Sequence, residues 1–306
     1  MPYDKSDPRT QLAAPTTAAA GVPRAAHYRE LHESPPDETN TGGGTTWWTR
    51  SQAAVVGFTE SRASDVLRTP AGIDAEHVLL VLDGSLRIDH ESGPADVSEP
   101  SVVIVPPGES TITVDADGSF VRLFAADAAP DLAARCANAA DYAEPDENVA
   151  PFTPWPDPPD GSRARVYPLS QHPLETGRLG RIFRCSTLMV NVFGDGDGPR
   201  DPAKLSPHHH DDFEQISLQV RGDYVHHMRR PWTPDSSTWA DDEHQRCSAP
   251  AVVVIPPLLI HTSQSVEDMG HWLIDVFAPP RVDFSERPGW VLNAAEYPMP
   301  ELVTTG

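Results

Sequence analysis

Proline occurs throughout this chain, and its frequency restricts the possible fold more than any other feature. The sequence has 33 prolines and 20 glycines among 306 residues. Proline lacks a backbone donor and breaks helix interiors, so this pattern favours many short strands joined by tight turns over long helices. We therefore expect an all-β fold.

The strand-like segments form two series, and the chain length suits two domains of about 150 residues better than one. The first series covers 53–58, 77–88, 101–108 and 120–126, and the second covers 164–169, 181–193, 213–228, 251–257 and 271–280. A helical and proline-rich stretch separates them. We predict five parts: a flexible arm (1–45), a first barrel (46–130), a linker (131–162), a second barrel (163–280) and a tail that packs on a barrel or partner (281–306).

Charge and composition limit the classes of partner. The formal net charge is -22, from 45 acidic and 23 basic residues, and such a field repels nucleic-acid backbones and anionic membrane surfaces. No segment approaches the roughly 20 apolar residues of a membrane span, and no export signal is evident. The three cysteines are widely spaced, which fits a reducing compartment. We expect a soluble cytoplasmic protein that acts on a small molecule and binds neither nucleic acid nor membrane.

Two histidine-containing segments indicate a metal site. They are PHHHDDFEQ at 207–215 and VVVIPPLLIHTSQ at 252–264. In an extended backbone His208 and His210 project to the same face, Glu214 joins them at an even offset, and His261 enters from a second strand. The middle histidine, His209, should point the other way.

The two halves of the sequence repeat the spacing of key residues. Glu214 precedes Gly222 by eight residues, as Glu76 precedes Gly84, and VVVIPP ends at Pro257 as VVIVPP ends at Pro107. These anchors pair three imidazole positions with residues that are not histidine: His208 with Pro70, His210 with Gly72, and His261 with Thr111. We infer an internal duplication in which only the second half keeps the full metal set.

The pattern HxH, three residues, Glu, a glycine turn, a proline-containing strand and a final His resembles the two motifs of the cupin superfamily. The duplication makes the chain similar to a bicupin from about Trp47 to Pro280. The resemblance implies two β-barrels of the jelly-roll type. The chain departs from the motif in two places. Seven residues rather than the usual six separate Glu214 from Gly222, and Leu258 replaces the small glycine that usually follows the prolines.

Three imidazoles and one carboxylate would leave a six-coordinate divalent metal two adjacent open positions. We expect one transition-metal ion per chain, with iron(II) preferred and manganese, nickel, copper or zinc as alternatives. Further candidates line the second barrel. His226, Gln215 and Gln264 are candidates for orienting ligands or moving protons. Tyr224, His227, Arg229, Arg230 and Trp272 are candidates for substrate contacts, with paired surface charges and barrel packing as the competing interpretations.

Three functions fit the predicted site. The first is a dioxygenase acting on a small organic acid, enol or phenol, which the apolar strands of the second half favour because oxygen chemistry prefers a dry pocket. The second is an isomerase, epimerase or lyase of a sugar acid or related polar substrate, in which the metal is a Lewis acid. The third is a non-catalytic binder. A polar inward face would remove the reason for preferring oxygenation. We also expect a homodimer.

Overall fold

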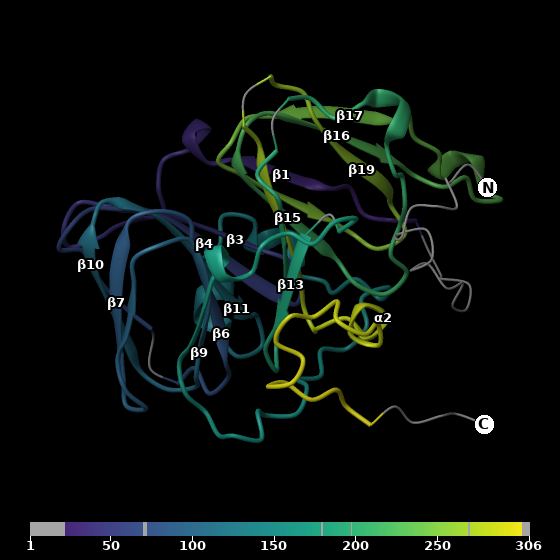
Figure 1. Cartoon of the computed structure of the whole chain (residues 1–306). Helices are drawn as coiled ribbons and strands as arrows, with labels where there is room; N and C mark the ends of the chain where they lie inside the picture. The colour runs from purple at the N-terminus through teal and green to yellow at the C-terminus, as the bar shows by residue number, and fades with distance from the viewer. Residues whose placement is uncertain (1–21, 70–71, 179, 197, 269, 302–306) are drawn as a thin grey trace. The chain divides into compact units, whose positions relative to one another are not determined.

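The computed structural model describes residues 22–69, 72–178, 180–196, 198–268 and 270–301. Over these residues the regular secondary structure consists mainly of strands, with a few single 3-10 turns and two short α-helices, α1 (Pro130–Arg135) and α2 (Val282–Ser285) (Figure 1). The all-β prediction is confirmed. In the described part of the chain, no helix is both long enough and apolar enough to cross a membrane.

The chain divides into two compact units, each assembled from three segments. Of the described residues, those within 36–140, 152–190 and 278–301 belong to the N-terminal unit, and those within 22–35, 141–151 and 191–277 belong to the C-terminal unit. The sequence-based boundaries had placed one contiguous barrel in each half. Residues 1–21 of the predicted arm and residues 302–306 of the predicted tail lie outside the described residues.

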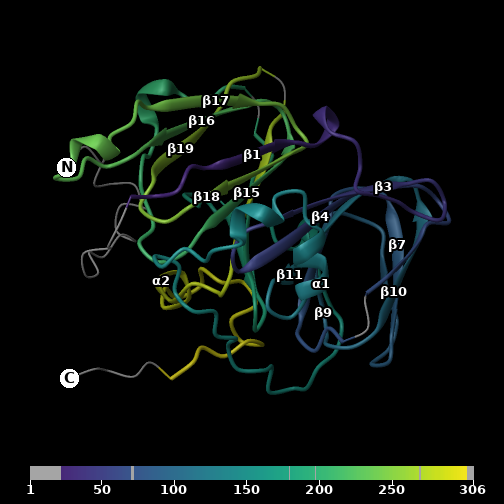
Figure 2. The ribbon, with the colours of Figure 1, turned by 180° about the vertical axis from the view of Figure 1, so that it is seen from behind.

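Two antiparallel sheets form the N-terminal unit. The larger has the strand order β12-β9-β6-β11-β4-β3-β2, and the smaller has the order β5-β10-β7-β8. Figures 1 and 2 label β9, β11, β4 and β3 of the larger sheet and β7 and β10 of the smaller one. Their bounds are β2 (Glu38–Thr39), β3 (Thr45–Arg50), β4 (Ala54–Ser61), β5 (Val66–Arg68), β6 (His77–Val81), β7 (Ser85–His90), β8 (Ala95–Val97), β9 (Ser101–Val105), β10 (Ser110–Ala116), β11 (Gly118–Ala125) and β12 (Arg165–Pro168). Strand β13 (Gly180–Arg184) also belongs to this unit.

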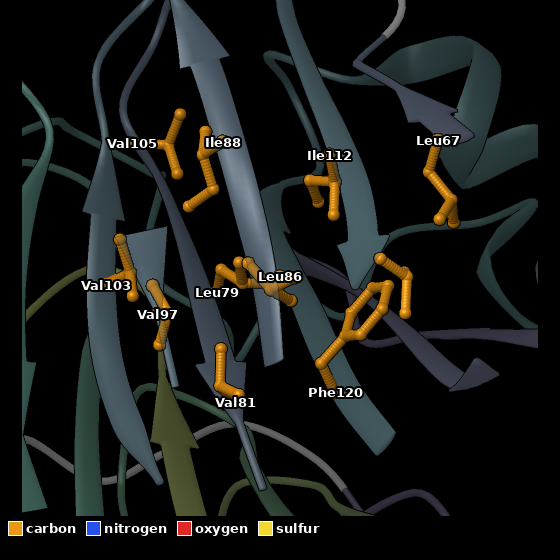
Figure 3. Packing of buried hydrophobic residues seen from close by; sticks show 11 residues of the cluster. Leu67, Leu79, Val81, Leu86, Ile88, Val97, Val103, Val105, Ile112 and Phe120 are labelled. Atoms are coloured by element: carbon orange, nitrogen blue, oxygen red, sulfur yellow. The ribbon is translucent and has the colours of Figure 1, made fainter. Parts of the chain in front are cut away.

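The core of the N-terminal unit lies between these two sheets. Alternate residues of β6, Leu79 and Val81, meet Leu86 and Ile88 of β7, and Phe120 of β11 packs among them (Figure 3). Each of these side chains is at most 2% exposed. Alternation therefore defines the inward face of each strand, which includes Leu79 on β6 and Phe120 on β11.

Two sheets also form the C-terminal unit. One contains β1-β18-β15-β20, with β14 beside β20, and the other has the order β17-β16-β19. Their bounds are β1 (His27–Glu30), β14 (Met189–Phe193, of which residues 191–193 belong to this unit), β15 (Gln215–Arg221), β16 (Tyr224–Arg229), β17 (Glu243–Cys247), β18 (Ala251–Ile255), β19 (Ile260–Ser265) and β20 (Trp272–Phe277). Met228 and Cys247 pack against Val253 and Ile255 in the core.

Strand β1 comes from the segment predicted to be a flexible arm. Its residues 27–30 pair antiparallel with residues 251–254 of β18, and the Leu31 amide continues the pairing by donating to Pro250. Tyr28 packs on the core, and Leu31 is 1% exposed. The described part of this segment therefore completes a sheet edge of the C-terminal unit.

The tail after residue 278 belongs to the N-terminal unit. Tyr297 is buried, and its hydroxyl donates to Oε1 of Glu76 at 3.0 Å. The other carboxylate oxygen accepts from the amide and hydroxyl of Ser186, at 2.9 and 2.7 Å. Glu76 thus holds together three segments of its own unit, a structural use of the residue that the sequence repeat had paired with Glu214.

Candidate metal centre

Three imidazoles of the C-terminal unit converge. His208 and His261 form a β-bridge in which each backbone amide donates to the other residue's carbonyl, at 3.0 and 2.7 Å. His210 follows two residues after His208, and its ring lies 5.1 Å from the ring of His208. One nitrogen from each of the three rings lies within 4.8 Å of the others. The predicted grouping of these three residues is present in the structure.

Backbone carbonyls fix the tautomers of two of these rings. Nδ1 of His208 lies 2.9 Å from the carbonyl oxygen of Ser206, and Nδ1 of His261 lies 2.9 Å from that of Leu259. A carbonyl only accepts, so Nδ1 carries the proton and Nε2 keeps its lone pair. Metal-binding histidines are commonly oriented in this way. The donor set therefore fits a metal ion.

Glu214 and Gln215 are adjacent residues with different surroundings. Glu214 is not part of the histidine group, and its Oε1 accepts a hydrogen bond of 3.0 Å from the Tyr142 hydroxyl. Oε1 of Gln215 lies 3.0 Å from Nε2 of His210. An amide oxygen only accepts, so Nε2 of His210 carries the proton of this contact in the structure. The amide oxygen of Gln215 thus lies beside the histidine group, at the start of the strand that follows it.

A polar row continues from Gln215 along β15. The Gln215 side-chain amide donates to Ser217 at 3.0 Å, and the Ser217 hydroxyl donates to Asp275 of β20 at 2.7 Å. All three residues are buried. Because Nε2 of Gln215 is used in this way, its Oε1 is turned toward His210. The inward residues of β15 are therefore polar, contrary to the expectation of an apolar wall.

His226 belongs to a second buried hydrogen-bond chain. Its Nε2 lies 2.7 Å from Gln219 Oε1, its Nδ1 lies 2.9 Å from the Ser263 hydroxyl, and the amide of Gln219 donates to the Cys247 carbonyl. Burial, aided by the nearby His261 and His227, lowers the pKa of His226 to about 3. His226 is therefore neutral at physiological pH, with Nε2 donating and Nδ1 accepting.

The other candidate residues lie on β16, just after its end, or on the strands β19 and β20, and only some of them have buried side chains. Tyr224 is buried beside His226, and its burial raises the phenol pKa. His227 lies on the opposite face, where it contacts His244 and Gln264 at 2.7 and 3.2 Å. The other three predicted residues lie as follows: Arg229 is exposed and paired with Asp242, Arg230 is partly buried beyond the strand end, and Trp272 is buried with its indole donating to Phe193.

The structure also identifies residues that the sequence reasoning missed. Ser217, Gln219, Ser263 and Asp275 all take part in the buried chains around the site, and Tyr142 holds Glu214. Alternation from Gln215 would have indicated Ser217 and Gln219. No sequence signal indicated Tyr142, because it is 72 residues from its partner.

Comparisons with known proteins identify the architecture. No protein-family model and no curated protein sequence matches this chain. Solved structures do: the formate complex of Lactobacillus farciminis oxalate decarboxylase is 14% identical, with a TM-score of 0.53 over 87% of this chain and 88% of that one. A Bacillus subtilis oxalate decarboxylase, studied for its Mn(II) centres, is 12% identical, with a TM-score of 0.56 over 92% and 84%. These are cupin β-barrel proteins. The chain has the cupin fold.

AerE from Microcystis aeruginosa is similar at 8% identity and a TM-score of 0.51, over 85% of this chain and 99% of that one.

With the cupin fold established, the spacing in the first motif becomes informative. The motif usually has six residues between its carboxylate ligand and the turn glycine. Six residues separate Gln215 from Gly222, whereas seven separate Glu214 from it. Gln215 thus occupies the position of the motif's carboxylate.

The second departure from the cupin motif lies at the turn before His261. Leu258 replaces the expected glycine and adopts a positive φ of 69°, while Gly108 at the equivalent turn of the N-terminal unit has a φ of 109°. The Leu258 amide donates to the His210 carbonyl at 2.6 Å. The left-handed conformation is strained for leucine. The hydrogen bond from Leu258 to His210 joins the segment that contains His261 to the segment that contains His208 and His210.

The N-terminal unit has hydroxyl groups where the C-terminal unit has two histidines. Ser110 pairs with His90 as His261 pairs with Met228, so strand register makes Ser110, rather than Thr111, the counterpart of His261. The Thr69 amide donates to the Ser110 carbonyl, as that of His208 does to His261. Thr69 and Ser110 hydroxyls are 2.6 Å apart.

Proposed function

We propose that this chain is a metal-dependent enzyme whose centre is formed by His208, His210, His261 and Gln215. The convergence of three imidazole nitrogens within 4.8 Å, with the amide oxygen of Gln215 beside them, is the observation that supports it. Nitrogen-rich sites of this kind suit iron(II) and manganese(II) as well as later first-row metals. Iron(II) remains our first proposal. Manganese is the second, since a Bacillus subtilis oxalate decarboxylase with a similar fold has Mn(II) centres.

The proposed substrate is a small organic acid. Four neutral donors would leave a divalent ion with its full charge, so an anionic oxygen of the substrate is the natural partner at an open position. The bound metal would supply Lewis acidity toward a substrate carbonyl. The protein would supply orientation: Asp275 accepts from Ser217, which accepts from Gln215, and this chain holds Oε1 of Gln215 toward His210.

The polar row on β15 favours Lewis-acid chemistry, so we propose a lyase or isomerase reaction first. Gln215, Ser217 and Asp275 offer buried hydrogen-bonding groups beside the histidines. Oxygenation, which apolar strands had favoured, depends on a dry pocket, and the inward residues of β15 do not provide one. The polar residues of this strand project inward, while the apolar Ile216 and Leu218 project to the other face.

Dioxygenation of a small organic acid, enol or phenol is the second candidate, because aromatic rings cover one side of the site. Phe213 lies 4.3 Å and Phe277 6.2 Å from the ring of His210, and the two phenylalanines contact each other. These rings would exclude water from that side of the centre. They are the observation that favours oxygen chemistry.

Metal analysis followed by paired aerobic and anaerobic assays tests the proposal. Protein purified without oxygen would be reconstituted separately with iron(II) and manganese(II), then given a panel of keto acids, hydroxy acids, enols and phenols. Product formation without oxygen supports the lyase or isomerase proposal, and oxygen consumption that matches product supports dioxygenation. Failure to retain any divalent metal would refute the proposed function.

A further inference from the structure

The N-terminal unit contains a buried cation on the inward face of its larger sheet. Arg122 of β11 is two residues from Phe120, and His77 of β6 is two residues from Leu79, so both share the face that forms the core. Register pairs Arg122 with Leu79, which makes His77 and Arg122 diagonal neighbours across the two strands. Arg122 is 4% exposed and His77 is 1% exposed.

Aromatic rings hold this pair in position. The guanidinium of Arg122 lies 4.8 Å from the centre of the Trp48 ring, and the imidazole of His77 stacks on Phe124 at 4.7 Å. Gly57 lies between Trp48 and Arg122 in the sheet, and a Cβ there would come within 2.3 Å of the indole. The indole therefore lies over Gly57 to reach the guanidinium. These contacts orient the two polar groups and leave their hydrogen-bonding capacity unused.

Among the residues that the structure describes, neither group has a hydrogen-bond or ion-pair partner. Nε of Arg122 and both ring nitrogens of His77 are buried without an acceptor or donor. The nearest carboxylate in sequence, that of Glu76, is used by Ser186 and Tyr297. Burial lowers the pKa of Arg122 to about 10, so the guanidinium is still charged at neutral pH. A buried charge without a counter-charge is unfavourable, and the contact with the Trp48 ring offsets only part of this cost.

The two units place opposite charges at the same strand position. Register pairs Asp275 with Ser217 in the C-terminal unit and Arg122 with Leu79 in the N-terminal unit. Counted back from the turn glycines Gly84 and Gly222, His77 of the N-terminal unit corresponds to Gln215 of the C-terminal unit. A carboxylate near the predicted metal centre is thus replaced by a guanidinium. A site with hydroxyl groups in place of His208 and His261 and with a cation in place of Asp275 is suited to an anion.

We propose that Arg122 and His77 form a binding site for a small carboxylate inside the N-terminal unit. The carboxylate would accept hydrogen bonds from the planar guanidinium and from the neutral imidazole, and it would provide the missing counter-charge. Both side chains are almost fully buried, so the ligand that we propose is a small carboxylate such as formate or acetate. His90 alternates with the inward residues Leu86 and Ile88 of β7 and also lines an open depression with Ser92 and Pro107. Neither Arg122 nor His77 lines this depression, and we propose it as the side from which the ligand enters.

Calorimetric titration of the full chain with acetate, at constant ionic strength, tests this site. We expect one acetate per chain in the N-terminal unit, with affinity reduced about ten- to hundredfold by Arg122→Met, because a charge-assisted hydrogen bond is lost. His77→Phe should weaken binding and keep the arginine. Arg87→Met is the matched control, since Arg87 is an exposed arginine of the same unit that is paired with Asp89 and Asp96.

Two further measurements separate this site from other anion effects. Binding should persist in His261→Ala, so a failure of the proposed metal centre leaves the carboxylate site testable. Chloride and phosphate titrations distinguish a carboxylate site from a general anion site. Acetate binding that is absent in the natural sequence, or unchanged by both Arg122→Met and His77→Phe, would overturn the proposal, as would equal or tighter binding of chloride or phosphate.

Discussion

The Gln215 amide oxygen lies 3.0 Å from Nε2 of His210, whereas the carboxylate of Glu214, one residue earlier, is hydrogen-bonded to Tyr142. Adjacent residues in an extended backbone project to opposite faces, so only one of the two can join the histidines. Ligand chemistry favours the glutamate, because carboxylates are the more usual ligands. We propose the glutamine instead, because the strand begins at Gln215 and the side chain of Gln215 lies beside His210.

Substitutions at these two positions should have different effects on metal affinity. We expect Gln215→Ala to weaken manganese or zinc binding about ten- to hundredfold, and Glu214→Gln to leave it within about threefold. Gln215→Glu should tighten binding, since it adds a negative charge to a neutral donor set. Competition with a metal indicator measures all three affinities. Loss of metal in Glu214→Gln with retention in Gln215→Ala would return the glutamate to the site.

The metal should depend on the C-terminal unit alone. His208→Ala and His261→Ala are each expected to abolish metal retention during gel filtration, because each removes an imidazole whose Nδ1 is already fixed by a backbone carbonyl. Ser110→Ala and Thr111→Ala are the matched controls in the other unit and should retain one metal per chain. Metal content by elemental analysis decides the outcome. Metal loss in either control would show that the two halves are not asymmetric.

Alternation and spacing were enough to predict the β architecture and the grouping of His208, His210 and His261. They could not distinguish Glu214 from Gln215 as the proposed fourth ligand, because a slip of one residue at the strand start moves the glutamate or the glutamine to the inward face. The pairing of His261 with Thr111 failed for a similar reason. The turn before Ser110 is one residue shorter than the turn before His261, and only strand register reveals it.

Trp48 and Gly57 provide a test of how the buried arginine is supported. Gly57→Ala would put a Cβ within 2.3 Å of the Trp48 ring, so the indole must shift from its place over the sheet. We expect a loss of about 1–3 kcal/mol in the free energy of unfolding. The same substitution in a Trp48→Leu background should cost less, because the clashing ring is absent. Urea unfolding of the four proteins measures this coupling, and equal costs in the two backgrounds would contradict the predicted contact.

Buried neutral histidines should make the protein sensitive to acid. Burial, with the nearby charge of Arg122 and a smaller effect of His90, lowers the pKa of His77 to about 3, and burial lowers that of His226 to the same value. In the unfolded chain both would protonate near their ordinary value of 6.5. Between these values the unfolded state binds more protons. The free energy of unfolding therefore falls as the pH drops from 6.5 toward 3, and neither histidine changes it above that window.

His77→Phe isolates one of these contributions, because phenylalanine keeps the stacking on Phe124 and cannot be protonated. At pH 5 each histidine accounts for about 2 kcal/mol of lost stability, so the variant should show a visibly shallower dependence between pH 4 and pH 6.5. Urea unfolding across this range, in buffers without carboxylates, provides the measurement. His32→Gln, which changes an exposed histidine, should retain the original slope. An unchanged slope in His77→Phe would mean that His77 is already protonated in the folded protein, or that the folded state admits water to its ring.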